Sequence, residues 1–147
     1  MDLRDKTVLI LGGAGLVGIA VARKMLESAP RRIVVGSLRR EDAEAAVAEL
    51  KTAPRAKGVH LEAFWGDLFV PWASKDLPRA EILTDPERRK QLVDDIYSEL
   101  TDDVFRRSTL GRLLEDTRPQ ILVDCINTAG ALAYQNVFAS AQRLRDA

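Results

Sequence analysis

Glycines near the start of the chain are the residues whose spacing points most directly to chemistry. Gly13, Gly15 and Gly18 fit the pattern G-x-G-x-x-G. With Gly12 in place of Gly13, the same residues also fit G-x-x-G-x-x-G. An apolar run over 7–11 precedes them and an amphipathic stretch follows, which predicts a strand, a tight turn and a helix. Such a turn lets a pyrophosphate approach the main chain, where free N–H groups at the helix start bind the anion.

The glycine turn therefore predicts a site for the diphosphate of a dinucleotide. The alternative is a tight turn between a strand and a helix that binds no ligand. In the first interpretation, Gly18 packs the helix against the strand. The residues expected to hold the pyrophosphate are Gly12, Gly13, Gly15, Leu16 and Val17.

Two arginines follow the second predicted strand, which ends at Ser37. In a dinucleotide-binding unit, an acid at this point binds both ribose hydroxyls, whereas a nearby arginine accepts a 2′-phosphate. The arginines are Arg39 and Arg40, and the first acids, Glu41 and Asp42, suit the start of a helix. Because guanidinium groups and a serine hydroxyl fit a dianionic phosphate, these residues predict NADP rather than NAD. The alternative is that both arginines are solvated surface charges.

Two further short segments lie where strands are expected to end. Gly66-Asp67-Leu68 follows the third predicted strand, and Asn127-Thr128-Ala129-Gly130 follows the fourth. A carboxylate at Asp67 can accept a hydrogen bond from an amine, and the small Ala129 and Gly130 let a ligand pass close to the backbone. Without a ligand, the same segments would form an Asx turn and an ordinary strand-to-helix turn.

The glycine spacing and these two segments resemble the short-chain dehydrogenase/reductase superfamily, especially its extended branch of epimerases and dehydratases. The resemblance implies a Rossmann fold, an NAD(P) cofactor and hydride transfer at a carbonyl or alcohol carbon. It also implies that Asp67 and Leu68 flank the adenine. Near the nicotinamide-side ribose, the residues implied to line the cleft are Asn127, Ala129 and Gly130. The N-terminal strands also resemble saccharopine-dehydrogenase-like reductases, in which arginine likewise follows the second strand.

The superfamily's catalytic tyrosine and lysine, spaced i and i+4, are absent from the sequence. Tyr97 is followed four residues later by Thr101, and Tyr134 is followed by Phe138. We therefore expect no catalytic residue in this chain and no activity from it alone. Two explanations stay open: the chain is the N-terminal part of a longer oxidoreductase, or it is a non-catalytic nucleotide-binding sensor or scaffold.

Hydrophobic patterning predicts a single NAD(P)-binding Rossmann domain over 1–147, with a three-layer α/β/α architecture. The parallel sheet is expected in the order 3-2-1-4, because the first three strands and two helices form one mononucleotide-binding half. The expected strands are 6–11, 32–37, 59–65 and 119–126, and the expected helices are 15–28, 41–52 and 132–145.

The segment 68–107 is expected to form a helical insertion between the third and fourth strands. Up to Thr84 it holds prolines and scattered aromatic residues, which suggest irregular structure. Asp85-Pro86 is a signal for the start of a helix, and a second helix is expected over 104–117 with Gly111 as a candidate break. The aromatic residues expected to pack the insertion, rather than stack on a base, are Trp65, Phe69 and Trp72.

The composition argues against several classes of partner. Lysine plus arginine and aspartate plus glutamate number 22 each, and a zero balance disfavours nucleic acid or an anionic membrane. No apolar run approaches the ~20 residues of a membrane span, and the charged N-terminus is unlike a signal peptide, so we expect a cytoplasmic protein. The lone Cys125 and the lone His60 predict no disulfide and no metal site. An exposed edge of the fourth strand would favour a homo-oligomer.

Overall fold

A four-stranded sheet forms the centre of the computed structural model, which describes residues 2–126 and 143–144. Its strand order is β3-β2-β1-β4, which confirms the predicted order 3-2-1-4. All three pairs of neighbouring strands are parallel. The strands are β1 (Thr7–Leu11), β2 (Arg32–Ser37), β3 (His60–Trp65) and β4 (Ile121–Asp124).

Strand β1 lies between two partners and is buried along its whole length. Its side chains alternate between the two faces of the sheet: Val8 and Ile10 belong to one apolar cluster, whereas Leu9 and Leu11 belong to another. A strand that is covered on both faces needs apolar residues at successive positions. This is why a continuous apolar run, rather than an alternating one, predicted the strand.

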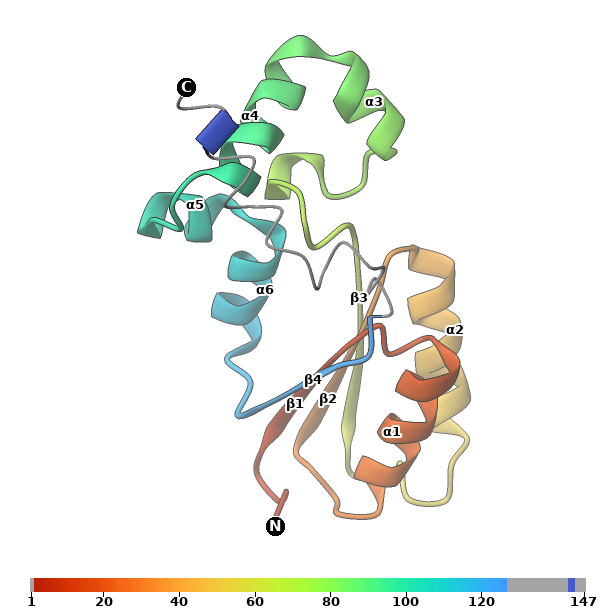
Figure 1. Ribbon diagram of the computed structural model, residues 1–147. Coiled ribbons are helices and arrows are strands. Elements are labelled where there is room, and N and C mark those ends of the chain that lie inside the picture. Colours follow the sequence, from red (N-terminus) through yellow and green to blue (C-terminus); the bar gives the residue numbers. More distant parts are fainter. Residues whose placement is uncertain (1, 127–142, 145–147) are drawn as a thin grey trace.

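Helices cover both faces of the sheet (Figure 1). On one face lie α1 (Leu16–Leu26) and α2 (Arg40–Lys51), and Leu26 and Leu50 of these helices are buried in the first cluster. On the other face, α6 (Thr109–Thr117) contributes buried side chains to the second cluster. The predicted three-layer architecture is therefore confirmed.

The segment between β3 and β4 stands above the carboxyl ends of the strands (Figure 1). Val70, Ile82 and Leu92 are buried there in a small apolar cluster of their own. Two of its helices are joined by an ion pair, because Arg107 Nε lies 3.1 Å from Asp95 Oδ1. The hydrogen bonds to this carboxylate raise the pKa of Arg107 above its usual value. The elements are the 3-10 turn Trp72–Ser74, α3 (Arg79–Thr84), α4 (Pro86–Tyr97) and α5 (Asp102–Arg107).

The insertion leaves and rejoins the Rossmann unit at one point. Pro71 and Ser108 form an isolated antiparallel bridge there. Beside this bridge, the carbonyl oxygen of Val70 accepts hydrogen bonds from the backbone N–H of Thr109 at 3.0 Å and from its hydroxyl at 2.8 Å. These contacts join the beginning and the end of the insertion to each other.

Removing the buried Thr109 hydroxyl should loosen this closure. Thr109→Val keeps the shape of the side chain but takes one hydrogen bond from the Val70 carbonyl, so the free energy of unfolding should fall by about 1 kcal/mol. Urea denaturation measures the change. Thr84→Val is the matched control, because the Thr84 hydroxyl bonds Glu81 O on the exposed surface of α3, and it should stay within ~0.5 kcal/mol of the wild type. Equal losses in both variants would contradict the prediction.

The break between the last two helices differs from the prediction. One helix was expected over 104–117 with Gly111 as its candidate break, whereas the structure separates α5 from α6 at Ser108. Ser108 caps α6, because its hydroxyl accepts a hydrogen bond from the Gly111 N–H at 2.9 Å. Gly111 serves close packing instead, since a Cβ there would lie 1.9 Å from the carbonyl oxygen of Phe105.

The start of α4 follows the prediction made from Asp85-Pro86. The Asp85 carboxylate accepts hydrogen bonds from the backbone N–H groups of Glu87 at 3.0 Å and Arg88 at 3.1 Å. The stretch before it was expected to be irregular up to Thr84, but it contains the short helix α3. The expectation of irregular structure was therefore wrong for 79–84.

The end of the sheet also differs slightly from the prediction. Strand β4 covers 121–124 rather than 119–126, although the N–H groups of Gln120 and Cys125 still donate to backbone oxygens of β1. The helix predicted over 132–145 lies outside the described residues, apart from 143–144.

Candidate functional site

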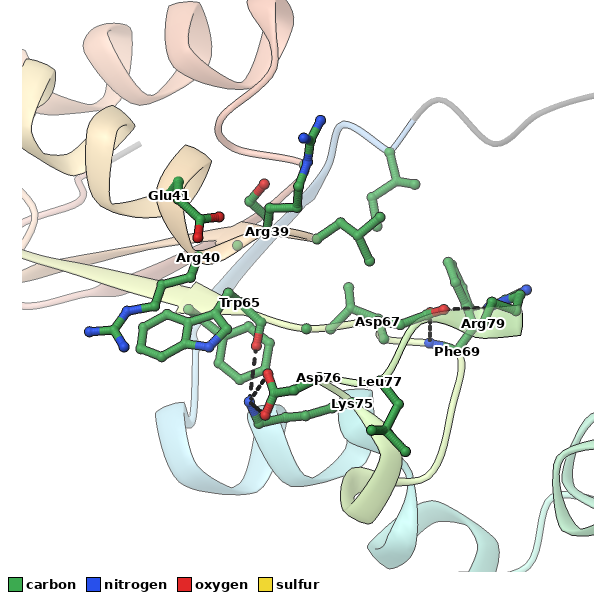
Figure 2. Close-up of a pocket in the computed structure, with 18 of the residues that line it drawn as sticks. Arg39, Arg40, Glu41, Trp65, Asp67, Phe69, Lys75, Asp76, Leu77 and Arg79 are labelled. Atoms are coloured by element: carbon green, nitrogen blue, oxygen red, sulfur yellow. Dashed lines mark hydrogen bonds and ion pairs between the residues drawn. The ribbon is translucent and has the colours of Figure 1, made fainter. Parts of the chain in front are cut away.

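A cavity of about 1090 Å³ opens where the strands end and the insertion begins. Figure 2 shows side chains from both parts of the molecule facing this space. Ligands of open parallel sheets bind at this position, in the crevice outside the carboxyl ends of the strands. The lining residues come from the glycine turn (12, 15), the end of β2 (36–41), the end of β3 (64–69), the insertion (75–79) and the end of β4 (125–126).

Three of the four glycines in the turn are required by the packing of the protein itself. Gly12 has a φ of +69°, which side chains rarely adopt. A Cβ on Gly13 would lie 2.8 Å from Val35 Cγ1, and a Cβ on Gly18 would lie 2.3 Å from the Gly12 carbonyl oxygen. The tight turn and the close approach of α1 to β1 therefore account for these three residues without any ligand.

Gly15 differs from the other three glycines. A Cβ there would meet only the Gly12 oxygen, at an ordinary contact distance of 3.4 Å, and its φ of −75° suits any residue. The residue lines the main cavity and also a smaller hollow of about 490 Å³ between α1 and α2. Nothing in the described protein requires glycine at this position, so the missing side chain leaves space for something that approaches the backbone.

The first turn of α1, which begins beside this space at Gly15, contains backbone donors without an acceptor in the helix. Gly15 is its N-cap and makes no side-chain capping bond, and the first bond along the helix runs from Ile19 N to Gly15 O at 2.9 Å. The N–H groups of Leu16 and Val17 precede that bond and have no acceptor within the helix. In contrast, the Gly13 N–H donates to Gly36 O at 2.8 Å. The Gly15 N–H likewise donates to Gly12 O at 3.1 Å.

Of the residues expected to hold a pyrophosphate, those at the start of α1 are therefore the best placed to donate hydrogen bonds to it. The glycines at 12, 13 and 18 shape the turn, while Leu16 and Val17 supply donors that have no acceptor in the helix. Both of these side chains are exposed, so they leave the helix end open. Sequence spacing predicted the turn but did not separate the shaping residues from the donating ones.

The two arginines after β2 have different surroundings. Arg40 Nε lies 2.7 Å from Glu44 Oε1, and its guanidinium lies 4.8 Å from the centre of the Trp65 ring. Hydrogen bonding to Glu44 raises the pKa of Arg40 above its usual value. Arg39 makes a looser pair, with Nε 3.3 Å from Asp42 Oδ2 and a side chain that is 75% exposed. Arg39 is therefore the more available of the two cations at the cavity.

Asp67 is held on two sides at the opposite end of the cavity (Figure 2). Its Oδ1 accepts a hydrogen bond from the Phe69 N–H at 2.9 Å, which is an Asx turn. Its Oδ2 lies 2.6 Å from Nη2 of Arg79, the first residue of α3. The sequence pointed to Asp67 but missed Arg79, because no spacing relates an arginine in the insertion to the end of β3.

Leu68, which was expected to flank the adenine, is mainly a core residue. It is buried in the second apolar cluster with Leu113, although it also borders the cavity. Ser37 ends β2 as expected and lines the cavity as well. The three remaining expected site residues, Asn127, Ala129 and Gly130, lie outside the described part of the chain.

A second residue that the sequence did not single out is Lys75. Its ammonium lies between 5.3 and 5.9 Å from the ring centres of Phe64, Trp65 and Trp72, and 2.7 Å from Asp76 Oδ1. Such cation–ring contacts are attractive. Trp65 and Trp72 thus pack the base of the insertion, as expected, whereas Phe69 is 52% exposed at the cavity.

Comparison with known proteins agrees with the glycine turn and its position before α1. Residues 6–77 match the family described as "KR domain", a ketoreductase of the short-chain type. The matched residues cover just under half of the chain. The match confirms the superfamily that the motifs resembled, while the extended branch of that superfamily stays a prediction.

Several solved dehydrogenase structures are similar to this chain. A dehydrogenase from Burkholderia cenocepacia with bound NADP is 27% identical, with 63% of this chain and 32% of that chain covered and a TM-score of 0.41. A short-chain type dehydrogenase/reductase from Mycobacterium ulcerans is 17% identical (80% and 46% covered, TM-score 0.43). L-sorbose reductase from Gluconobacter frateurii, complexed with NADPH and L-sorbose, is 15% identical (98% and 63% covered, TM-score 0.47).

The chain spans between 32% and 63% of the length of these three structures. No curated protein matches it. Over the described residues, the structure contains no cluster of His, Cys, Asp and Glu able to hold a metal. No helix in that part of the chain combines the length and the apolar character that a membrane span needs.

Proposed function

We propose that this chain binds a nicotinamide dinucleotide and supplies the cofactor site of a short-chain dehydrogenase-type oxidoreductase. The observation that carries the proposal is the helix start at Gly15. There the packing does not need a glycine, and the N–H groups of Leu16 and Val17 have no acceptor within the helix. A cavity of about 1090 Å³ continues from that point toward β3, and a helix N-terminus beside a cleft suits a bound diphosphate.

The parts of the cofactor would lie along the ends of the strands. The diphosphate would bind at the first turn of α1, with the adenosine ribose beyond it, near Ser37 and Arg39. The adenine would lie between the ends of β2 and β3, next to Asp67. Asn127, Ala129 and Gly130 are proposed for the nicotinamide-side ribose on the basis of the resemblance alone.

We further propose that NADP is preferred over NAD. Arg39 is close in sequence to Ser37 and makes only a loose ion pair with Asp42. Its exposed guanidinium can therefore rotate away from Asp42 and bind a 2′-phosphate. Of the acids that follow β2, Asp42 pairs with Arg39 and Glu44 pairs with Arg40, while Glu41 lies in the first turn of α2. No acid stands directly at the end of β2, where residues 37–40 are Ser, Leu, Arg and Arg and where an NAD site would have one.

The parent reaction we propose is hydride transfer at a carbonyl or alcohol carbon. The chain's own residues would bind and orient the cofactor but would not move the proton. No tyrosine in the 147 residues is followed four positions later by lysine. This feature of the sequence equally favours a second candidate, a nucleotide-binding protein without catalysis, and the two share the same cofactor site.

Removing Arg39 should abolish the preference for NADPH. Arg39→Ala is expected to weaken NADPH binding by about tenfold, the worth of a charged hydrogen bond, and to leave NADH binding unchanged. Arg40→Ala should have a smaller effect, since its guanidinium is already bound by Glu44 and Trp65. Calorimetric titration of both dinucleotides measures the ratio.

Arg4→Ala is the matched control for this prediction. Arg4 and Arg39 have the same side-chain exposure, 75%, and each pairs with an aspartate close in sequence, but Arg4 lies at the N-terminus. The preference should persist in Arg4→Ala and should weaken with added salt in the wild type. Equal affinities of the wild type for NADPH and NADH would rule out the 2′-phosphate site.

A further inference from the structure

We propose that Arg79, which the insertion supplies, is a specificity-determining residue that reads the base of the dinucleotide together with Asp67. The inference rests on the proposed function, since it assigns the base-recognising groups of the same site. It gives the insertion a part in ligand recognition.

Arg79 lies against Asp67 at one end of the cavity (Figure 2). Both residues line the cavity. The Arg79 side chain is 50% exposed, whereas that of Asp67 is only 14% exposed, and Nη2 lies 2.6 Å from Oδ2. The contact joins one nitrogen of the guanidinium to one oxygen of the carboxylate. Since a guanidinium carries five N–H donors and a carboxylate about four acceptor sites, both groups retain capacity for a ligand.

The surrounding backbone fixes this pair in place. The Phe69 N–H holds Asp67 Oδ1 at 2.9 Å. The Asp67 N–H in turn donates to the carbonyl oxygen of Lys75 at 2.9 Å, and that residue is anchored among three aromatic rings. The first residues of the insertion are therefore tied to the end of β3, and Arg79 follows them within four positions. A pair held this firmly can select a ligand by geometry.

The charge of Arg79 makes Asp67 compatible with an anionic ligand. A shielded carboxylate without a partner would be costly, and it would repel the phosphates of a dinucleotide. Arg79 offsets that charge, and the carboxylate oxygens still have capacity to accept a hydrogen bond from a ligand. Beside the pair, the half-exposed ring of Phe69 offers an apolar face to a flat base.

The acceptor Asp67 and the neighbouring donor Arg79 together complement the edge of adenine that carries its amino group. The exocyclic N6 amine can donate to Asp67, and the neighbouring N1 can accept from Arg79. The same logic explains why paired donors and acceptors recognise adenine in nucleic acids. A base in which N1 and N6 are bridged by an etheno group has the same shape of sugar and phosphates but offers neither contact.

The test compares NADP⁺ with 1,N6-etheno-NADP⁺ by calorimetric titration. The wild type should bind the etheno compound about tenfold or more weakly, because the polar pair then lacks its partners. In Arg79→Met, which keeps the aliphatic stem, both compounds lose the charge that offsets Asp67, but only NADP⁺ loses the contact to N1, so the ratio should fall to about threefold. Arg79→Lys should restore part of the ratio, since it keeps a charged donor.

Arg88→Ala is the control, because Arg88 has a similar exposure of 48% and pairs with Asp85 on α4, away from the cavity. Its ratio should equal that of the wild type. A wild-type ratio near one, or an unchanged ratio in Arg79→Met, overturns the inference while leaving dinucleotide binding intact. Failure of the wild type to bind either compound overturns the proposed function, and the inference with it. Should Arg79→Met not fold, Arg79→Leu, which also removes the charge and every donor, gives the same decision.

Discussion

Replacing Gly15 with alanine is expected to weaken NADP⁺ binding by roughly 2 kcal/mol, about thirtyfold, through the loss of close hydrogen bonds to the diphosphate. The melting temperature of the ligand-free protein should stay nearly unchanged. A Cβ at this position meets only the Gly12 oxygen, at 3.4 Å, and the backbone has an ordinary φ of −75°. The added methyl group therefore disturbs the ligand and not the fold.

Calorimetric titration and thermal melting of Gly15→Ala, each compared with the wild type, separate these two effects. An alanine variant that keeps the affinity of the wild type would mean that no ligand approaches the backbone at Gly15. A variant that loses its fold would mean that the position serves packing, like the other glycines of the turn. Either result would remove the main support for the proposed diphosphate site.

Replacing Gly18 with alanine should have the opposite effect, a loss of stability. The Cβ would lie 2.3 Å from the Gly12 carbonyl oxygen and 2.5 Å from Gly13 Cα, and both atoms belong to the backbone of the turn. Neither can yield without moving α1 away from β1. We expect a destabilisation of about 3 kcal/mol, at the upper end for overpacking.

For a chain of this size, such a loss corresponds to a melting temperature lower by roughly 6–12 °C. Because Gly15→Ala and Gly18→Ala make the same chemical change three residues apart, each is the control for the other. A Gly18→Ala protein as stable as the wild type would contradict the close packing of α1 on the turn.

Much of the fold could be predicted because its signals are local. The apolar residues within 32–37 marked β2 with its observed bounds, since a central parallel strand is buried on both faces. Asp85-Pro86 marked the start of α4, because a capping carboxylate and a proline in the first turn act on adjacent residues. The order of the strands followed from alternating strands and helices.

The boundary between α5 and α6 could not be predicted in the same way. Glycine inside a helical pattern suggests a break, but Gly111 is needed because the Phe105 carbonyl comes close to it. Ser108 acts as the cap, and serine is common in many other settings. Only the folded backbone distinguishes a glycine that breaks a helix from one that makes room.

The candidate site was predictable as a turn but not as a set of contacts. Whether a glycine leaves room for a ligand depends on atoms far away in sequence, such as Val35 beside Gly13. The partners of the charged residues likewise come from other elements of the fold: Arg40 lies against the Trp65 ring, and Arg79 forms an ion pair with Asp67. Spacing along the chain cannot reveal these pairings, which decide the cations and acceptors available to a ligand.

The most direct test of the account is a titration of the ¹⁵N-labelled protein with NADP⁺, followed through its backbone amide NMR signals. If the diphosphate binds at the start of α1, the largest shifts will occur at Leu16 and Val17, with smaller shifts at the ends of β2 and β3. Saturation at about 100 times Kd should also stabilise the protein by roughly 2.7 kcal/mol. Unmoved amide signals at the start of α1, with no gain in stability, would contradict the account.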